Sequence, residues 1–339
     1  MANKPTLSIM MANYNYGQYI GESLEAILTQ SFSPTEVIVT DDGSTDNSVE
    51  VIRGFQKRYP NLRLLRNEKN MGVLYSINRC LSEAKGDYVY PASSDDKVLP
   101  GFFEKSMDMF MKYPQAGLCC SDLAVLNTGY EVFEIKFYLS GKPRYFSPDE
   151  AVGLLLKEAF TPIMPNTVII KHSALLEAGG YLAETKWSCD SFSQHVACFR
   201  HGFCYIPEAL ALVRRHSNQW GSGLSTKHEF EREVVMKIMD LLRTPAYQDV
   251  YPMFKKTGCF SSQPWDALYV AAFNRKYRDF LTFKLIRYGI FDKFIKWPIQ
   301  TLMPQPFLIF CHKVLNVIRH IKSFIFPKKA SDNRAKREK

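Results

Sequence analysis

Residues 7–46 read LSIMMANYNYGQYIGESLEAILTQSFSPTEVIVTDDGSTD. The stretch starts with a short apolar run at 7–12 and continues with apolar residues three or four positions apart over 17–29. It finishes with the β-branched run EVIVT at 36–40 and two aspartates. An apolar run, a helical period and a β-branched run predict a strand, a helix and a second strand. Strands that alternate with helices indicate parallel pairing, in a sheet with helices on both faces.

The same alternation continues to residue 126. We expect helices over residues 48–59, 73–84 and 100–113, and strands over residues 61–66, 87–92 and 117–126. Ligands of such sheets bind at the carboxyl ends of the strands. The loops after Ala12, Thr40 and Ala92 should therefore share one crevice.

The second half of the chain has a different pattern. Residues 128–165 alternate only weakly. We expect helices over 148–160 and 190–200, strands over 166–171 and 204–213, and a mainly helical chain from residue 226.

Acidic side chains follow two of the predicted strands. Asp41-Asp42-Gly43-Ser44-Thr45-Asp46 comes after the strand at 36–40. Carboxylates there could accept hydrogen bonds from a base or a ribose. The alternative is a turn around Gly43 in which Ser44 or Thr45 caps the next helix.

Ser93-Ser94-Asp95-Asp96 comes after the strand at 87–92. A hard cation such as Mg²⁺ or Mn²⁺ takes one or two carboxylates together with phosphate oxygens and waters. Acids on this loop therefore suit a metal–diphosphate complex. The alternative is a helix N-cap ahead of residues 97–103.

Two further residues are candidates for chemistry. Tyr14 lies in the loop after the first strand, where an aromatic ring can stack on a nucleobase, or simply pack on its neighbours. Asp190 lies at the start of a predicted helix, where a carboxylate is normally ionised. An ionised carboxylate can accept a proton from a hydroxyl, although most acids at this position are simple caps.

Three ordered blocks connect these residues, namely the stretch from residue 7 to VEVI at 49–52, KNMGVLYSINRCLSEAKGDYVYPASSDDKVLPGFFE at 69–104 and NTVIIKHSALLEAGGYLAETKWSCDSFSQHVACFRHG at 166–202. Together they resemble the inverting family 2 glycosyltransferases over roughly residues 5–220. The resemblance implies an α/β fold of the GT-A type, the nucleotide-diphospho-sugar transferase fold. That fold has a Rossmann-like, mostly parallel sheet flanked by helices, here with a helical C-terminal extension.

The resemblance also implies a role for each candidate. Asn13, Tyr14, Asp41 and Asp42 would bind the nucleotide, with Tyr14 and Asp41 at the base. Asp95 would be the metal-binding acid of the D-x-D motif, beside the nucleotide. Asp190 would be the catalytic base that deprotonates the acceptor hydroxyl. The cofactor would be Mn²⁺ or Mg²⁺, and the donor a nucleotide sugar, foremost a uridine diphosphate sugar.

His216 follows the last predicted strand. The resemblance implies that it approaches the diphosphate and its metal, whereas the alternative places it in a surface loop. The chain also departs from the family pattern. Ser93 occupies the usual first Asp of D-x-D, so one metal ligand or ribose contact is expected to be missing. Cys189 replaces the acid that often precedes the base, and Ala12-Asn13 replaces Pro-Thr.

The resemblance suggests a division of the chain into parts. Residues 1–225 would form the catalytic domain, with a nucleotide-sugar half at 1–125 and an acceptor half at 126–225. Residues 226–330 would be a basic helical extension, and 331–339 a disordered tail.

The net charge of +9 is concentrated at the C-terminus. Residues 281–339 hold 13 Lys and Arg against 3 Asp and Glu, whereas the other 280 residues hold 30 and 31. A neutral body argues against a nucleic-acid partner, and a basic tail favours an anionic surface. Residues 307–326 form an amphipathic, basic, aromatic-rich stripe that suits a membrane interface. The alternative is a helix packed on the catalytic domain.

Location follows from several absences in the sequence. There is no run of 18 apolar residues and no signal peptide at the start, and eight cysteines are too few for a disulfide scaffold. We expect a cytoplasmic protein, peripheral at the inner face of the cell membrane. Its acceptor would be a saccharide or lipid-linked saccharide, in bacterial cell-surface polysaccharide or glycolipid synthesis.

The sequence leaves two alternative functions and one alternative metal site to consider. A nucleotidyltransferase would need a Gly-rich phosphate loop, but residues 13–17 hold one glycine. A catalytically impaired nucleotide-sugar-binding or scaffold protein at the membrane is favoured by Ser93 and disfavoured by the retention of Asp95 and Asp190. A zinc site at Cys189, His195, Cys198, His201 and Cys204 fits no common ligand spacing.

Overall fold

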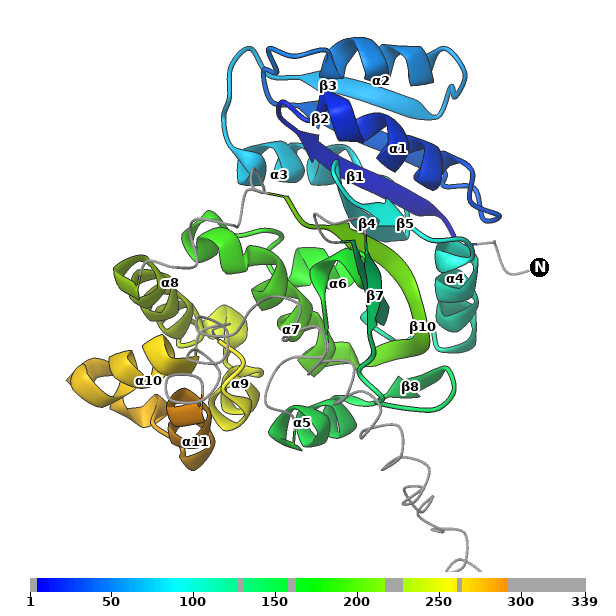
Figure 1. The fold of residues 1–339 in the computed structure, drawn as a ribbon. Helices are drawn as coiled ribbons and strands as arrows, with labels where there is room; N and C mark the ends of the chain where they lie inside the picture. Colours follow the sequence, from blue (N-terminus) through cyan, green and yellow to red (C-terminus); the bar gives the residue numbers. More distant parts are fainter. Residues whose placement is uncertain (1–4, 127–130, 158–162, 217–227, 261–263, 292–339) are drawn as a thin grey trace, which may run out of the picture.

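The computed structural model describes residues 5–126, 131–157, 163–216, 228–260 and 264–291. Its N-terminal half confirms the predicted alternation of strands and helices (Figure 1). The elements are β1 (Leu7–Asn13), α1 (Gly17–Leu28), β2 (Glu36–Asp41), α2 (Ser48–Gln56), β3 (Leu62–Arg66), α3 (Val73–Glu83), β4 (Tyr88–Ser93), β5 (Lys97–Val98), α4 (Phe102–Lys112) and β6 (Leu118–Leu126).

The acceptor half predicted at 126–225 adds further strands and helices to the same sheet. They are β7 (Val132–Ile135), β8 (Arg144–Phe146), α5 (Pro148–Lys157), the 3₁₀ turn η1 (Pro165–Thr167), β9 (Ile169–Lys171), α6 (His172–Glu177), the 3₁₀ turn η2 (Ala183–Ser188), α7 (Cys189–His201) and β10 (Phe203–Arg214). The strands run in the order β3-β2-β1-β4-β9-β6-β10-β5, with β7 beside β6 and β8 beside β10.

The long strands pair in parallel, as predicted: β1 with β2 and β4, β2 with β3, and β6 with β10. The short strands β5, β7, β8 and β9 pair antiparallel with their neighbours, so the sheet is mostly parallel. β7 follows β6 after only five residues, and a parallel partner would need a crossover of a dozen or more.

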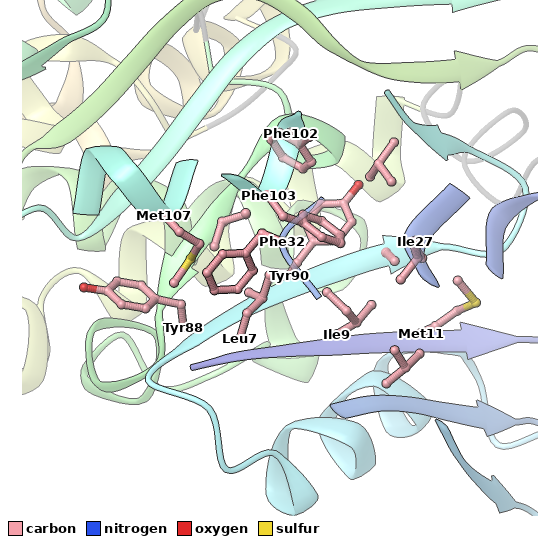
Figure 2. Close-up of a cluster of buried hydrophobic side chains, with 14 of the residues drawn as sticks. Leu7, Ile9, Met11, Ile27, Phe32, Tyr88, Tyr90, Phe102, Phe103 and Met107 are labelled. Carbon is pink, nitrogen blue, oxygen red and sulfur yellow. The ribbon is translucent and has the colours of Figure 1, made fainter. Parts of the chain in front are cut away.

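Two apolar cores cover the two faces of the sheet. Successive side chains of a strand point to opposite faces, so Leu7, Ile9 and Met11 of β1 enter the core under α1 and α4, while Met10 enters the other. Figure 2 shows the first core, in which Phe102 and Phe103 of α4 belong to one cluster with these β1 side chains. The opposite core packs against α3, α5, α6 and α7.

The chain beyond β10 is helical, as expected. It forms α8 (His228–Leu241), η3 (Pro245–Tyr247), α9 (Tyr251–Thr257), α10 (Pro264–Phe273), η4 (Arg275–Phe280) and α11 (Phe283–Phe291). A third apolar cluster joins these helices to Val152 of α5 and to Phe192 and Val196 of α7. The C-terminal helices therefore share a core with α7, whose first turn contains Asp190.

No helix within the described ranges is long and apolar enough to cross a membrane. The amphipathic stripe at 307–326 and the predicted tail at 331–339 lie outside the described residues.

Candidate active site

Asn13 and Asp41 lie side by side at the carboxyl ends of β1 and β2, where the strand register pairs them. Asp41 has no exposed surface. Its carboxylate accepts hydrogen bonds from Asn13 Nδ2 at 3.1 Å and from the backbone N–H of Ser44 at 3.1 Å. Arg66 Nε lies 3.9 Å from Asp41 Oδ1. Asn13 Oδ1 is buried and accepts no hydrogen bond from any residue that the structure describes, so the pair is fixed and one acceptor remains unused.

Ser44 and Thr45 fasten the loop after β2 to the loop after β1. Ser44 Oγ accepts from Asn15 N at 3.0 Å, and Thr45 N donates to Asn15 Oδ1 at 2.8 Å. The interpretation of these residues as a helix cap is wrong, because α2 begins only at Ser48, where Asn47 precedes it without a side-chain cap.

Asp46 of the same loop connects the starts of two helices. Its Oδ2 accepts from the backbone N–H of Gly17 at 2.8 Å, and its Oδ1 accepts from Ser48 N at 3.0 Å. Although partial burial opposes ionisation, these hydrogen bonds and one from the Ser48 side chain hold the pKa of Asp46 below its usual range. Asp46 therefore has a structural role, which the pattern of the Asp41–Asp46 segment did not indicate.

Asp42 organises the loop that leads into α3. Its Oδ1 accepts from Asn67 Nδ2 at 2.6 Å and from Met71 N at 2.9 Å, and its Oδ2 accepts from Gly72 N at 2.8 Å. Gly72 has φ +91°, a conformation that favours glycine. The carboxylate of Asp42 thus satisfies backbone N–H groups ahead of the helix.

Tyr14 is the exposed aromatic residue at this edge of the sheet, with 42% of its surface accessible. The next residue, Asn15, has φ 55° and turns the chain away from the strand. Tyr16 and Tyr19 face elsewhere, since both contact the ring of His216. Tyr14 is therefore placed where a flat ligand could cover it.

Asp95 and His216 meet at the carboxyl ends of β4 and β10. His216 Nε2 lies 3.0 Å from Asp95 Oδ2, and both side chains are 11% exposed. The His216 ring stacks on Tyr19 with centroids 4.8 Å apart. The alternative of a surface loop does not describe His216, because its side chain is enclosed and faces the loop after β4.

Asp96 anchors that loop. Its Oδ1 accepts from Arg214 N at 2.9 Å, and its Oδ2 accepts from Asn166 Nδ2. Burial, followed by the nearby charge of Asp95, raises the pKa of Asp96 to about 7. The helix-cap interpretation of this segment is wrong, because β5 follows it and pairs with β10.

The residues around Asp95 fit a divalent metal that takes most of its ligands from a diphosphate. Oδ1 of Asp95 accepts no hydrogen bond from the described residues, while Oδ2 faces His216. Ser93 Oγ instead accepts from Asn166 Nδ2 at 3.2 Å. The described residues contain no group of three or more His, Cys, Asp or Glu placed to hold a metal, so Asp95 and His216 would supply two positions and leave the rest open.

Asp190 lies at the first turn of α7 and is half-buried. Its Oδ1 accepts from Ser191 N at 2.6 Å. Burial raises the pKa of Asp190 to about 6, although the helix N-terminus and His195 favour ionisation. The expectation of an ordinarily ionised acid needs this correction, because desolvation outweighs the helix dipole.

The loop before Asp190 is held from two sides. Asn78 of α3 donates to Tyr181 O at 2.7 Å and accepts from Tyr181 N at 3.2 Å. Lys186 has φ 47°, an unfavourable backbone for a non-glycine residue. Its ammonium lies 2.8 Å from Glu233 of α8 and 4.3 Å from the Phe230 ring centroid.

Sequence reasoning missed these supporting residues. Their partners lie 47 or more positions away along the chain, from Lys186 with Glu233 to Arg214 with Asp96. A polar residue carries no local pattern when its partner is so distant. Lys186 lies four residues before Asp190 and Arg214 two residues before His216, so these two were near residues that the sequence already indicated.

The histidines of the alternative zinc site have other partners, and its three cysteines are buried. His201 Nε2 lies 2.8 Å from Glu177, and His195 Nδ1 lies 2.6 Å from Ser191 O. Cys189, Cys198 and Cys204 are buried free thiols. Burial raises the pKa of Cys204 to about 12, so this thiol stays protonated.

Comparison with known proteins identifies the family of this chain. The model for glycosyl transferase family 2 matches residues 8–153. The putative glycosyltransferase EpsE of Bacillus subtilis (strain 168) is 30% identical over 222 residues, which is 64% of this chain and 76% of EpsE.

Two solved structures have the same fold. S. aureus TarS 1–349 in complex with UDP-GlcNAc has a TM-score of 0.60 at 16% identity, over 86% of this chain and 92% of that one. The mannosyltransferase PcManGT from Pyrobaculum calidifontis, in complex with GDP-Man and Mn²⁺, has a TM-score of 0.54 at 17% identity, over 87% and 89%. The chain therefore belongs to glycosyltransferase family 2 and has a GT-A fold.

Proposed function

We propose that this glycosyltransferase moves a sugar from a nucleotide-diphosphate donor to an acceptor hydroxyl, with inversion at the anomeric carbon. The observation that carries the proposal is the convergence of Asn13, Asp41 and Asp95 at the carboxyl ends of the neighbouring strands β1, β2 and β4. Strand-end edges are where such sheets bind nucleotides. The nucleotide sugars in TarS and PcManGT support the donor class.

The base of the donor would lie against Tyr14 and face the Asn13–Asp41 pair. A uridine diphosphate sugar is the proposed donor, because uracil has one imide N–H that could donate a hydrogen bond to the unused Asn13 Oδ1. A buried acceptor without a partner costs about 1–3 kcal/mol, and a base N–H would remove that cost. Asp42 contributes indirectly, by holding the loop that borders this pocket.

Asp95 and His216 would hold Mn²⁺ or Mg²⁺ against the diphosphate. When bound, such an ion neutralises charge that grows on the leaving nucleoside diphosphate. Asp95 and His216 already lie 3.0 Å apart, and binding of the ion would replace the hydrogen bond between them with contacts to the metal. With Ser93 turned to Asn166, Asp95 is the acid of the D-x-D position that remains available.

Asp190 would be the base. With a pKa near 6, most of it is ionised at neutral pH, yet it holds a proton more strongly than an ordinary aspartate. Efficiency of a general base rises as its pKa approaches the working pH. Once the acceptor oxygen is deprotonated, it attacks the anomeric carbon from the face opposite the diphosphate, and a single displacement inverts the centre.

The biological role follows from the acceptor. We propose a saccharide or lipid-linked saccharide, in bacterial cell-surface polysaccharide or glycolipid synthesis, with the enzyme at the inner face of the cell membrane. The basic stripe at 307–326 supports this location. The division into a donor half at 1–125, an acceptor half at 126–225 and an extension at 226–330 is part of the same proposal.

A second candidate is a nucleotide-sugar-binding protein without turnover, which Ser93 favours. Release of nucleoside diphosphate by the wild type and by Asp190→Asn separates the two. The enzyme predicts turnover that the variant loses while it still binds nucleotide. A wild type that binds nucleotide and never turns over, whatever acceptor is supplied, would favour the binding protein. Proton NMR of the first-formed product tests inversion.

A further inference from the structure

The C-terminal helices expose an unusual amount of apolar surface. Six of the twelve large hydrophobic side chains that the described residues leave exposed lie between 269 and 290. Phe273 is 76% exposed and Phe283 is 82% exposed. The six, which we call the α10–α11 face, are Tyr269, Phe273, Leu281, Phe283, Ile286 and Ile290.

The face has a regular construction. Tyr269 and Phe273 are one turn apart on α10, with ring centroids 4.9 Å apart. Phe283, Ile286 and Ile290 recur at helical spacing along one side of α11. The two helices pack closely, since a side chain at Gly289 would meet Leu268 at 2.7 Å. Exposed apolar residues grouped in this way mark an interaction surface.

Arginines accompany these apolar residues along the same segment, and one of them, Arg287, lies 5.3 Å from the Tyr288 ring centroid. Arg275, Arg278 and Arg287 are exposed, and none has a carboxylate within ion-pair distance in the described ranges. The acidic residues nearby are already used, because Asp279 pairs with Arg243 and Asp266 pairs with Arg232 and His228. The face therefore presents aromatic and aliphatic groups together with uncompensated positive charge.

We infer that the α10–α11 face docks on an anionic lipid membrane. Aromatic and aliphatic groups beside Arg and Lys are what the headgroup–acyl boundary accommodates, and each basic residue near an anionic bilayer adds about fivefold to the partition coefficient. The inference concerns a surface remote from the catalytic residues and does not depend on the proposed sugar transfer.

Charge argues against the other occupants. A second copy in a two-fold dimer would set this face against itself, and the three arginines of one copy would then repel those of the other. The segment 292–339 would also be repelled, since it holds 11 Lys and Arg against 3 Asp and Glu. Nucleic acid matches the charge but leaves the aliphatic stripe of α11 in water.

Docking here would orient the acceptor half. The apolar cluster beneath the face includes Leu285 of α11 and Val270 of α10, and it continues to Phe192 and Val196 of α7. In Figure 1, α10 and α11 lie at the end of the molecule opposite β3 and α2. A membrane at this face would therefore hold α7, with Asp190, nearer to the bilayer than the nucleotide half.

The test is the partition of the full chain onto vesicles of phosphatidylcholine with or without 50% phosphatidylglycerol, followed by flotation. Phe273→Ser/Phe283→Ser should lower partition by about tenfold or more, and Arg275→Gln/Arg278→Gln/Arg287→Gln should do so on anionic vesicles only. Met111→Ser is the matched control, because Met111 is 54% exposed on α4. Unchanged thermal unfolding verifies that the variants fold.

Three results would overturn the inference. Both variants could partition like the wild type, which would assign any binding to the segment 292–339 alone. The Phe pair could convert a dimer to a monomer, by light scattering, without affecting flotation. The arginine variant could lose binding to a single-stranded oligonucleotide and keep binding to vesicles. Nucleotide-sugar turnover without vesicles would be unaffected by these variants, so failure here is distinguishable from failure of the proposed function.

Discussion

Replacement of Asp190 by Asn should stabilise the protein while it abolishes turnover. Burial raises the pKa of Asp190 from 3.8 to about 6. The folded state therefore binds this proton more strongly than the unfolded state between about pH 4 and 6, and stability falls as pH rises through that window. Two pKa units correspond to about 3 kcal/mol. Asn carries no charge and still accepts from Ser191 N, so it should recover about 1–3 kcal/mol at pH 8.

The measurement is thermal or urea unfolding of the wild type and Asp190→Asn at pH 4.5 and pH 8. A gain of stability at pH 8 that shrinks at pH 4.5 is expected. Asp149→Asn, exposed in the first turn of α5, is the matched control and should change little at either pH. Equal or lower stability of the Asp190 variant at pH 8 would refute the argument from burial.

The same residue sets the pH dependence of activity. Because the base must be ionised, kcat/KM should fall about tenfold per pH unit below pH 6. Asp190→Asn should lose about 10²–10⁴ in kcat and keep the dissociation constant for the nucleotide. Asp190 interacts electrostatically with His195, Tyr181 and Cys189. Because His195 lowers the pKa of Asp190, His195→Gln should move the acid limb of the pH–rate profile to higher pH. A profile that stays flat to pH 5 would remove Asp190 from the role of base.

Three further predictions concern the surroundings of the site. Asp95→Asn should raise the metal concentration for half-maximal activity by about tenfold or more, since one of two protein ligands loses its charge, and an unaltered metal titration would contradict its role. Gly117→Ala should lower the unfolding free energy by about 1–3 kcal/mol, because the new Cβ would lie 2.7 Å from Ala197 O. Gly153→Ala on α5 should instead raise it by up to about 1 kcal/mol, because no atom lies within 4 Å of the new Cβ. Equal effects of the two variants in denaturation would refute this prediction. Glu233→Gln should lower kcat about threefold or more with donor binding unchanged, as the strained Lys186 loses its partner, and wild-type kinetics would show that the ion pair is dispensable.

The sequence was sufficient for the parts of the fold that have a local pattern. The continuous apolar run at 7–12 is a property of adjacent positions and predicted a buried strand, and in the structure Leu7, Ile9 and Met11 enter one core while Met10 enters the other. The order of motifs then predicted that Asn13, Asp41 and Asp95 would gather at one edge. These expectations agree with the structure because a parallel sheet aligns its strand ends.

Other features depend on contacts that no local pattern contains. The antiparallel insertion of β9 between β4 and β6 is decided by which strands become neighbours. The placement of His216 against Asp95 joins residues 121 positions apart. The strained backbone of Lys186 is sustained by α8, whose partner residues lie 44 to 47 positions later. Desolvation of Asp190 likewise comes from packing and reverses what the helix N-terminus alone predicts.

The most direct test of sugar transfer is the release of nucleoside diphosphate from a panel of nucleotide sugars with Mn²⁺, with Mg²⁺ and with EDTA. The proposed function predicts release from one donor, a uridine diphosphate sugar, that depends on the metal and is absent in Asp190→Asn. Binding without release would leave the acceptor as the missing component, to be supplied from a panel of lipid-linked saccharides. The absence of both release and calorimetric binding for every nucleotide sugar in the panel would contradict the proposal.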